Sequence, residues 1–256
     1  MARWLDRLLG RDTGQRKPYV RRHDGLVSLQ FIRSQTQSRM VGDDPDRLLI
    51  DYTRTMFAAL LWHPAPAVLG MVGLGGGSQA KFAYRNLPET RIEVVENNPH
   101  VVALRGDFGI PDDDARLSVT VDDGVRFVQA RPAHFDVLLV DGYDEHGIPA
   151  ELSTQIFYDA CRDALSAQGV LACNLYVRDP QTHVDKLKDA FGADQVLVVD
   201  EPRMSNRVAF AWRGALPMLD AEALTGRVPL QVRALLPDVF PRIAVRVVRH
   251  RTVTGR

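Results

Sequence analysis

Short apolar runs alternate with amphipathic segments from about residue 67 to residue 212. The runs are rich in Val and Leu and bounded by turn residues, which predicts strands at 67–73, 91–96, 117–121, 135–141, 169–176, 195–199 and 207–212. Helical patterns lie between them, at about 78–87, 98–107, 123–130, 152–167 and 180–191. Continuous apolar runs are typical of parallel strands buried on both faces. The repeated unit predicts an α/β fold with a doubly wound sheet, in which 207–212 is an antiparallel strand at the end.

The two ends of the chain have other patterns. Runs at 25–32 and 35–40 predict a small β-hairpin, and a helix at 52–62 leads into the first strand of the sheet. We expect the basic segment 1–24 to be poorly ordered. A short helix near 220–236 and an Arg-rich tail are expected after the sheet. The predicted parts are therefore 1–55 (basic N-terminus and hairpin region), 56–215 (α/β domain) and 216–256 (helix and Arg-rich tail).

Composition excludes several classes of protein. The 256 residues are 45% hydrophobic and 25% charged, with a net charge of zero, which argues against a dedicated nucleic-acid binder. The zero averages a charge of −11 over residues 41–241 with +6 over 1–40 and +5 over 242–256. No apolar stretch reaches 18 residues, so we expect no membrane span. Two cysteines provide neither a disulfide framework nor a metal cluster, and a cytoplasmic protein without metal is expected.

A glycine-rich turn joins the first strand of the sheet to the first helix. Gly73, Gly75 and Gly77 permit a tight turn and a close backbone approach to a ligand, and Ser78 is a candidate helix cap. Glu96 ends the second strand, where a carboxylate can accept two hydrogen bonds from ribose hydroxyls. Together they predict a nucleoside-containing cofactor. A dinucleotide fingerprint needs glycine at Ser78, so the turn fits S-adenosylmethionine binders better, and the fold is expected to be Rossmann-like, of the methyltransferase type.

Acidic residues follow the third and fourth strands. Asp123 precedes Gly124 at the start of a helix, where it can accept from an adenine amino group, cap the helix, or do both. Asp141 and Asp144 lie outside the carboxyl end of the fourth strand, the usual place for ligands in open α/β sheets. Two such carboxylates can converge on a cation and raise each other's pKa, which suits a general base. The alternative for Asp141 is a buried cap of the next turn.

These residues resemble the spermidine synthase (polyamine aminopropyltransferase) family over about residues 25–215. The resemblance rests on the hairpin, the glycine turn, and three motifs in order: Val95-Glu96-Asn97-Asn98-Pro99, Asp122-Asp123-Gly124, and Asp141-Gly-Tyr-Asp144 followed by Ile156-Phe157-Tyr158. That family transfers an aminopropyl group from decarboxylated S-adenosylmethionine to a diamine. The resemblance implies this reaction in polyamine biosynthesis, a small amine acceptor, and a homodimer formed through the hairpin region.

The resemblance also implies roles for individual residues. Glu96 would hold the ribose, Asp123 with Gly124 the adenine, and Gln37 the cofactor from the hairpin. Asp141 matches the catalytic aspartate, which takes the proton from the attacking amine. Asp144 matches an aspartate that binds the amine, and Tyr52 a tyrosine that lines the substrate channel.

The chain departs from the family where the amines are held. Gly76 aligns with an aspartate that grips the aminopropyl ammonium, and Arg54 and Arg203 replace residues near the diamine. If either arginine faced the channel it would repel a polycation, which favours a neutral or acidic acceptor or intact S-adenosylmethionine.

Three other functions therefore remain as alternatives to an aminopropyltransferase-like enzyme. The first is an S-adenosylmethionine-dependent methyltransferase, and the second a non-catalytic nucleoside-binding module whose basic ends dock a partner. An NAD-dependent oxidoreductase is disfavoured by Ser78 and because no tyrosine has a lysine four residues later.

Overall fold

Seven of the apolar runs form one sheet in the order β6-β5-β4-β7-β8-β10-β9. The structure is a computed structural model that describes residues 15–32, 35–144 and 146–255. β10 runs antiparallel to β8 and β9, and the pairs among β4, β5, β6, β7 and β8 are parallel. The strands are β4 (Val68–Val72), β5 (Arg91–Glu96), β6 (Leu117–Val121), β7 (Phe135–Val140), β8 (Leu165–Leu175), β9 (Val196–Asp200) and β10 (Arg207–Trp212). The predicted doubly wound, methyltransferase-type sheet is confirmed.

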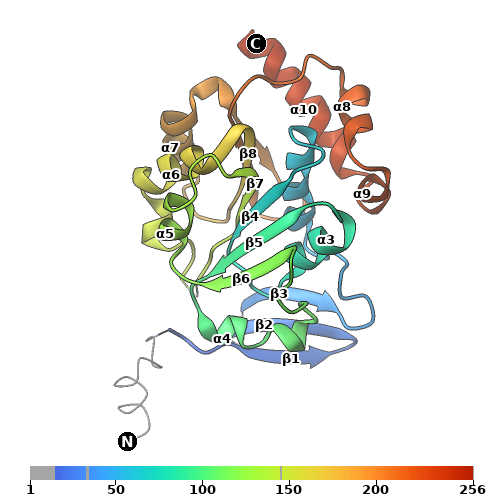
Figure 1. The fold of residues 1–256 in the computed structure, drawn as a ribbon, viewed down its shortest axis with the longest axis vertical. Helices are drawn as coiled ribbons and strands as arrows, with labels where there is room; N and C mark the ends of the chain where they lie inside the picture. Colours follow the sequence, from blue (N-terminus) through green and yellow to red (C-terminus); the bar gives the residue numbers. More distant parts are fainter. Residues whose placement is uncertain (1–14, 33–34, 145, 256) are drawn as a thin grey trace, which may run out of the picture.

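Helices cover both faces of this sheet, as Figure 1 shows, with α5, α6 and α7 on one side and α3, α8, α9 and α10 on the other. The alternation of side chains along β7 produces the two cores, since Val137 and Leu139 pack into one and Leu138 and Val140 into the other. The helices between the strands are α3 (Ser78–Asn86), α4 (Pro99–Val102), α5 (Gly124–Gln129), α6 (Gln155–Ala164) and α7 (Gln181–Phe191), with short 3₁₀ turns η2 (Arg105–Phe108), η3 (Ala150–Ser153) and η4 (Ala193–Gln195).

A three-stranded antiparallel sheet precedes the large one, where two strands were expected. Its strands are β1 (Tyr19–His23), β2 (Leu26–Ile32) and β3 (Gln35–Val41). Asp24 and Gly25, both at positive φ, form the tight turn between β1 and β2, and an Asp-Gly pair is a strong hairpin signal. The expectation of poor order over 1–24 is therefore wrong for β1, and residues 1–14 lie outside the described residues. The predicted helix 52–62 is α2 (Asp51–Met56) followed by η1 (Phe57–Leu61).

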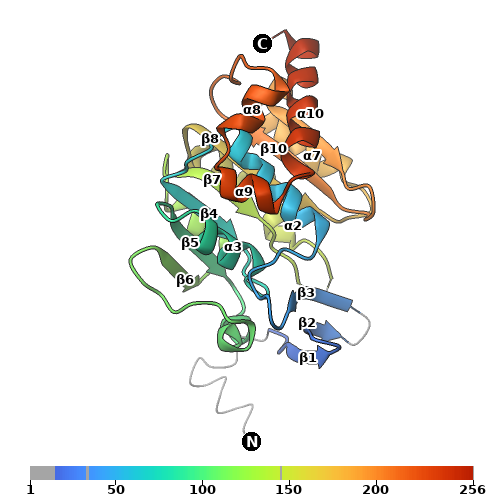
Figure 2. The same ribbon diagram turned by 90° about the vertical axis from the view of Figure 1, so that its right-hand side faces the viewer.

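The Arg-rich tail is a helix, which corrects the expectation of a short helix followed by a tail. The helices are α8 (Ala221–Arg227), α9 (Leu230–Leu235) and α10 (Val239–Thr254). Val239, Phe240, Ile243 and Val247 recur at helical spacing between the arginines of α10 and are buried. Figure 2 shows α9 and α10 beside α2. α10 therefore packs against the segment that leads into the large sheet.

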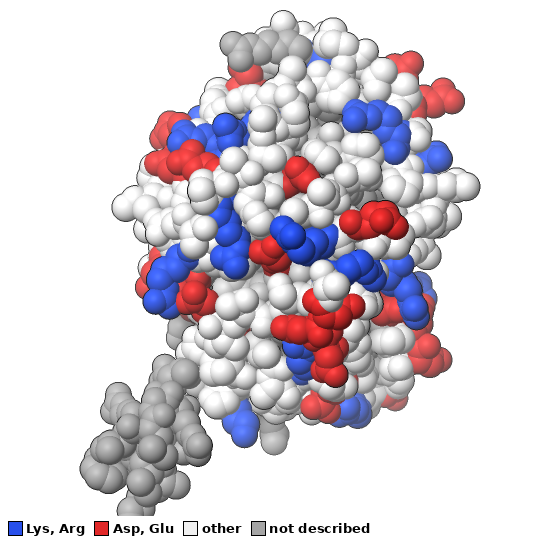
Figure 3. All heavy atoms as spheres, viewed as in Figure 1, with Lys and Arg blue, Asp and Glu red and all other residues white. Residues whose placement is uncertain are grey.

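One further helix boundary differs from the prediction. The helix expected over 152–167 ends at Ala164, because Leu165 already pairs with Phe135 of β7 as the start of β8. In Figure 3 basic and acidic side chains lie next to one another in scattered groups, with uncharged surface between them. None of the helices in the described part of the chain is both long and apolar enough to cross a membrane.

Candidate active site

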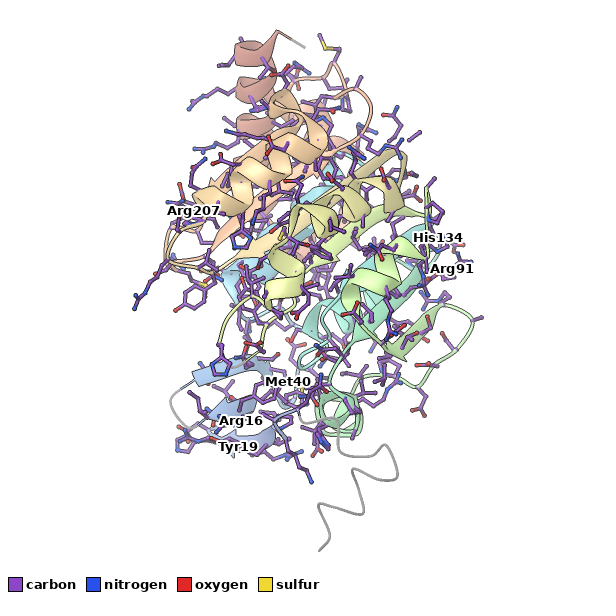
Figure 4. The ribbon with its side chains drawn as sticks, turned by 90° about the vertical axis from the view of Figure 1, so that its left-hand side faces the viewer. Arg16, Tyr19, Met40, Arg91, His134 and Arg207 are labelled. Carbon is purple, nitrogen blue, oxygen red and sulfur yellow. The ribbon has the colours of Figure 1, made fainter. Side chains whose placement is uncertain are left out.

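A cavity of about 730 Å³ opens where the carboxyl ends of β4, β5, β7 and β8 face the three-stranded sheet. In Figure 4, Arg207 marks this end of the strands, because it pairs with Leu175 at the end of β8. Arg91 and His134 mark the opposite, amino-terminal end. The cavity wall brings together nine of the ten predicted site residues: Gln37, Tyr52, Gly73, Gly75, Glu96, Asp123, Gly124, Asp141 and Asp144. Gly77 is the exception.

The glycine turn brings β4 and β7 together at the floor of the cavity. Gly73 has a φ of +99°, and a Cβ there would lie 2.4 Å from the carbonyl oxygen of Asp141. Only glycine fits this position without moving the backbone of the predicted base. At the end of the turn Gly77, not Ser78, occupies the N-cap position of α3. The Ser78 hydroxyl oxygen is buried and has no hydrogen-bond partner among the described residues, so the expectation of a Ser78 cap is wrong.

Glu96 closes the same turn from the end of β5. Its Oε2 accepts from the backbone N–H of Leu74 at 3.0 Å, and its Oε1 accepts from that of Asn98 at 2.9 Å. Burial raises the pKa of Glu96, and these backbone donors partly offset the rise. Glu96 also lines the cavity, where its carboxylate can accept a hydrogen bond from a hydroxyl of a bound ligand. The geometry suits a carboxylate that accepts hydrogen bonds from the hydroxyls of a ribose.

Asp123 caps α5, as one of its two expected roles requires. Its Oδ1 accepts from the backbone N–H of Arg126 at 2.9 Å. Asp122 pairs with the Arg126 guanidinium, and Gly124 lies beside Asp123 in the cavity wall. A contact of Asp123 with an adenine amino group stays a prediction, compatible with the cap.

Asp141 is held by two side chains from other elements. Its Oδ2 accepts from the Tyr52 hydroxyl at 3.1 Å, and its Oδ1 accepts from Asn174 Nδ2 at 2.9 Å. Asn206 Nδ2 in turn donates to Asn174 Oδ1 at 2.9 Å. Burial raises the pKa of Asp141, while the bonds from Asn174 and Tyr52 lower it. The carboxylate is oriented by side chains, which favours a base over the alternative of a turn cap.

Asp144 shapes the loop that carries it. Its Oδ1 accepts from the backbone N–H groups of His146 at 2.6 Å and Gly147 at 3.0 Å. Gln37 Nε2 donates to the Asp144 carbonyl oxygen at 3.3 Å, which joins β3 to this loop. The side chain of Asp144 thus has a structural task besides the predicted binding of an amine.

Three polar residues around Asp141 were missed in the sequence. Asn174 and Asn206 are buried, and the Tyr143 hydroxyl donates to the carbonyl oxygen of Asn174 at 2.9 Å and accepts from the Tyr176 N–H at 2.7 Å. The available signal was the position of Asn174, a polar residue near the carboxyl end of an apolar strand next to β7. Asn206 had no comparable signal, because its contact depends on how the segment before β10 folds back.

The three positions at which the chain departs from the family, 76, 54 and 203, have different surroundings in the structure. A Cβ at Gly76 would lie 2.6 Å from the Ser38 hydroxyl, so β3 fills the space that a side chain at position 76 would need. Arg54 pairs with Asp51 and Asp238 and does not line the cavity, whereas Arg203 does. Only one of the two arginines is therefore placed to repel a polycation.

Comparison with known proteins identifies the family. A model of the spermine/spermidine synthase domain matches residues 92–191. A polyamine aminopropyltransferase from Chromobacterium violaceum is 32% identical over 208 residues, which is 80% of this chain and 79% of the relative. The chain belongs to this family. Its members are transferases, which agrees with the resemblance drawn from the motifs.

Solved structures share the fold at lower identity. A probable spermidine synthase from Corynebacterium glutamicum has a TM-score of 0.66 and 19% identity, covering 87% of this chain and 91% of that one. Human methyltransferase-like protein 13 in complex with SAH has a TM-score of 0.62 and 22% identity, covering 75% and 92%. The fold is therefore shared by proteins of both names, and the sequence relationship selects the aminopropyltransferase family.

Proposed function

We propose that the protein transfers the aminopropyl group of decarboxylated S-adenosylmethionine to a primary amine in polyamine biosynthesis. The observation that carries this proposal is the buried carboxylate of Asp141, oriented by Tyr52 and Asn174 at the floor of a cavity that Glu96 also lines. Family membership supports the reaction class.

The donor would lie along the carboxyl ends of β4, β5 and β6. Glu96 would accept from the ribose hydroxyls, Asp123 and Gly124 would face the adenine, and the backbone of Gly73 and Gly75 would approach the nucleoside closely. Gln37 would contact the donor from β3. Donor and acceptor that fill this cavity would displace water from the reacting groups, which strengthens the electrostatic interactions between them and the protein.

Asp141 performs the proton transfer in this proposal. A protonated amine has no free lone pair, and its pKa lies near 10. As the amine nitrogen bonds to the aminopropyl carbon next to sulfur, the carbon–sulfur bond breaks and its electron pair stays on sulfur, releasing methylthioadenosine. The amine proton passes to Asp141, whose raised pKa makes it a better acceptor at neutral pH. Asp144 would bind the acceptor amine, and Tyr52 would line the substrate channel.

An Asp141→Asn variant tests this assignment. We expect it to bind methylthioadenosine like the wild type and to release methylthioadenosine from the decarboxylated donor about 10²–10⁴-fold more slowly. Asp112→Asn, at an exposed aspartate outside the cavity, is the matched control. Full activity of Asp141→Asn would remove it from the role of base.

Methyl transfer from intact S-adenosylmethionine is the second candidate. It is favoured because position 76 lacks the aspartate that grips the aminopropyl ammonium in the family, and the Ser38 hydroxyl lies in the space beside Gly76. It requires S-adenosylmethionine to bind more tightly than its decarboxylated form in calorimetry, and S-adenosylhomocysteine to be the product. Nucleoside binding without turnover of either donor would instead indicate a non-catalytic module.

A cytoplasmic location and a homodimer complete the proposal. The two cysteines, Cys161 and Cys173, are free and buried, which suits a reducing compartment. Light scattering on the purified protein measures the mass, and a monomer at micromolar concentration would reject the dimer.

A further inference from the structure

A second hollow, of about 360 Å³, adjoins the main cavity and shares Met204, Ser205 and Asn206 with it. Asn206 is the link to the reacting centre, because it donates to Asn174, which donates to Asp141. An acceptor whose amine lies at Asp141 can therefore extend along the segment 204–206 into the second hollow. This route determines which chemical groups the far end of the acceptor meets.

The charges along this route are positive. Arg203 lines the main cavity and Arg178 lines the second hollow. Within the described residues neither guanidinium has an ion pair or a side-chain hydrogen bond, and both side chains are exposed. Arg207 also lines the second hollow, but its charge is compensated by Asp200 at 2.7 Å.

The neighbouring acids do not neutralise Arg178 and Arg203. Asp179 accepts from the backbone N–H of Gln181 and from the Thr182 hydroxyl, at 3.1 Å each. Glu201 is buried and faces Arg242 on the other side of the segment. Two uncompensated cations therefore remain on the path from Asp141.

Two large side chains that are near these cations along the chain offer apolar surface in the main cavity. Tyr176 and Met204 line the main cavity, and they are 52% and 38% exposed although both are large and apolar. They offer a surface for a short methylene chain. A methylene chain with an amine at one end and an anion at the other would match these groups.

Building on the proposed function, we infer that the acceptor is a primary amine that also carries a carboxylate, bound through Arg203 and Arg178. A diamine without a carboxylate would instead place an uncompensated second ammonium beside two cations. Each exposed ion pair changes affinity by up to about fivefold, so the two arginines together favour the carboxylated amine over its decarboxylated counterpart by about tenfold. The chemistry at the amine is unchanged: its proton passes to Asp141, methylthioadenosine leaves, and the carboxylate takes no part.

Putrescine and ornithine form a matched pair for the test, since they differ only by the carboxylate. Methylthioadenosine release from the decarboxylated donor is measured with each acceptor, and kcat/KM is compared. We expect ornithine to exceed putrescine, and high salt to shrink its advantage because exposed pairs are screened. Arg203→Gln should reduce kcat/KM for ornithine about threefold to fivefold and raise it for putrescine. Arg246→Gln, at an exposed arginine of α10 outside both hollows, should change neither.

The outcomes separate this inference from the proposed function. The inference is overturned if kcat/KM is higher with putrescine than with ornithine. It is also overturned if the ratio of the two kcat/KM values is the same in Arg203→Gln and Arg178→Gln as in the wild type. Either result leaves the proposed aminopropyl transfer unaffected. Failure to release methylthioadenosine with either acceptor, by folded protein that binds methylthioadenosine, overturns the proposed function and the inference together.

Discussion

Replacing Arg242 by Met should destabilise the protein far more than replacing an α10 arginine that faces solvent. Arg242 donates to the Thr55 hydroxyl at 2.6 Å and lies 3.6 Å from Glu201 Oε1. The Glu201 side chain is only 1% exposed, and this oxygen has no hydrogen-bond partner. Arg242→Met keeps the apolar stem of the side chain and removes the charge that faces the buried carboxylate.

The magnitude follows from the burial of the two partners. Removing one member of a buried ion pair costs about 3–5 kcal/mol, because the other charge stays buried without compensation. Arg242 itself is 32% exposed, so water can partly reach the site and the lower end, about 3 kcal/mol, is expected. For a chain of this length each kcal/mol lowers Tm by about 2–4 °C, which predicts a decrease of about 6–12 °C.

Urea unfolding followed by circular dichroism measures this change, with thermal unfolding as a second observable. Arg246→Met, one turn along the same helix at an exposed position, is the control and should change stability by less than about 0.5 kcal/mol. The double variant Arg242→Met/Glu201→Leu should recover most of the loss, because it removes both charges. If Arg242→Met unfolds at the same urea concentration as Arg246→Met, the argument from the buried carboxylate is refuted.

Three other substitutions probe the site and the core beneath it. Tyr52→Phe removes a hydrogen bond that lowers the pKa of Asp141, so the acidic limb of the kcat/KM profile should move to higher pH; an unchanged limb would contradict this. Glu96→Gln should weaken methylthioadenosine binding about 10–100-fold in calorimetry, whereas a change within twofold would exclude Glu96 from the ribose site. Burial lowers the pKa of Lys81 from 10.5 to about 8, so between these pH values the unfolded chain holds a proton that the folded chain has released. The wild type should therefore gain stability relative to Lys81→Met as pH rises from 8 to 10.5, and parallel curves would disprove it.

Local signals were sufficient for the sheet and for most of the cavity wall. The strand–helix alternation predicts parallel strands, and the carboxyl ends of neighbouring parallel strands meet at one edge of the sheet. Residues at those ends, such as Glu96, Asp123 and Asp141, therefore had to converge once the strand order was known. The prediction worked because these positions depend on short segments of the chain, each with its own turn chemistry.

Contacts between residues that are far apart in the sequence could not be predicted in this way. Ser38 occupies the space beside Gly76, although 38 residues separate them, and no local pattern indicates that contact. Arg54 and Arg203 have equal charge in the sequence, yet Arg54 turns to Asp238 of the C-terminal region and Arg203 lines the cavity. Burial and partners assign these roles, and both exist only in the folded chain.

The C-terminal arginines show the same division. The excess of positive charge over residues 242–256, and the apolar residues at helical spacing among the arginines, can be recognised without a structure. The folded chain shows in addition that this segment is a helix packed on the core. Arg242 contacts Thr55 and the buried Glu201, whereas Arg246 is exposed to solvent. The physical reason is that a charge remains buried only when an opposite charge from elsewhere in the chain meets it, and sequence spacing does not specify that partner.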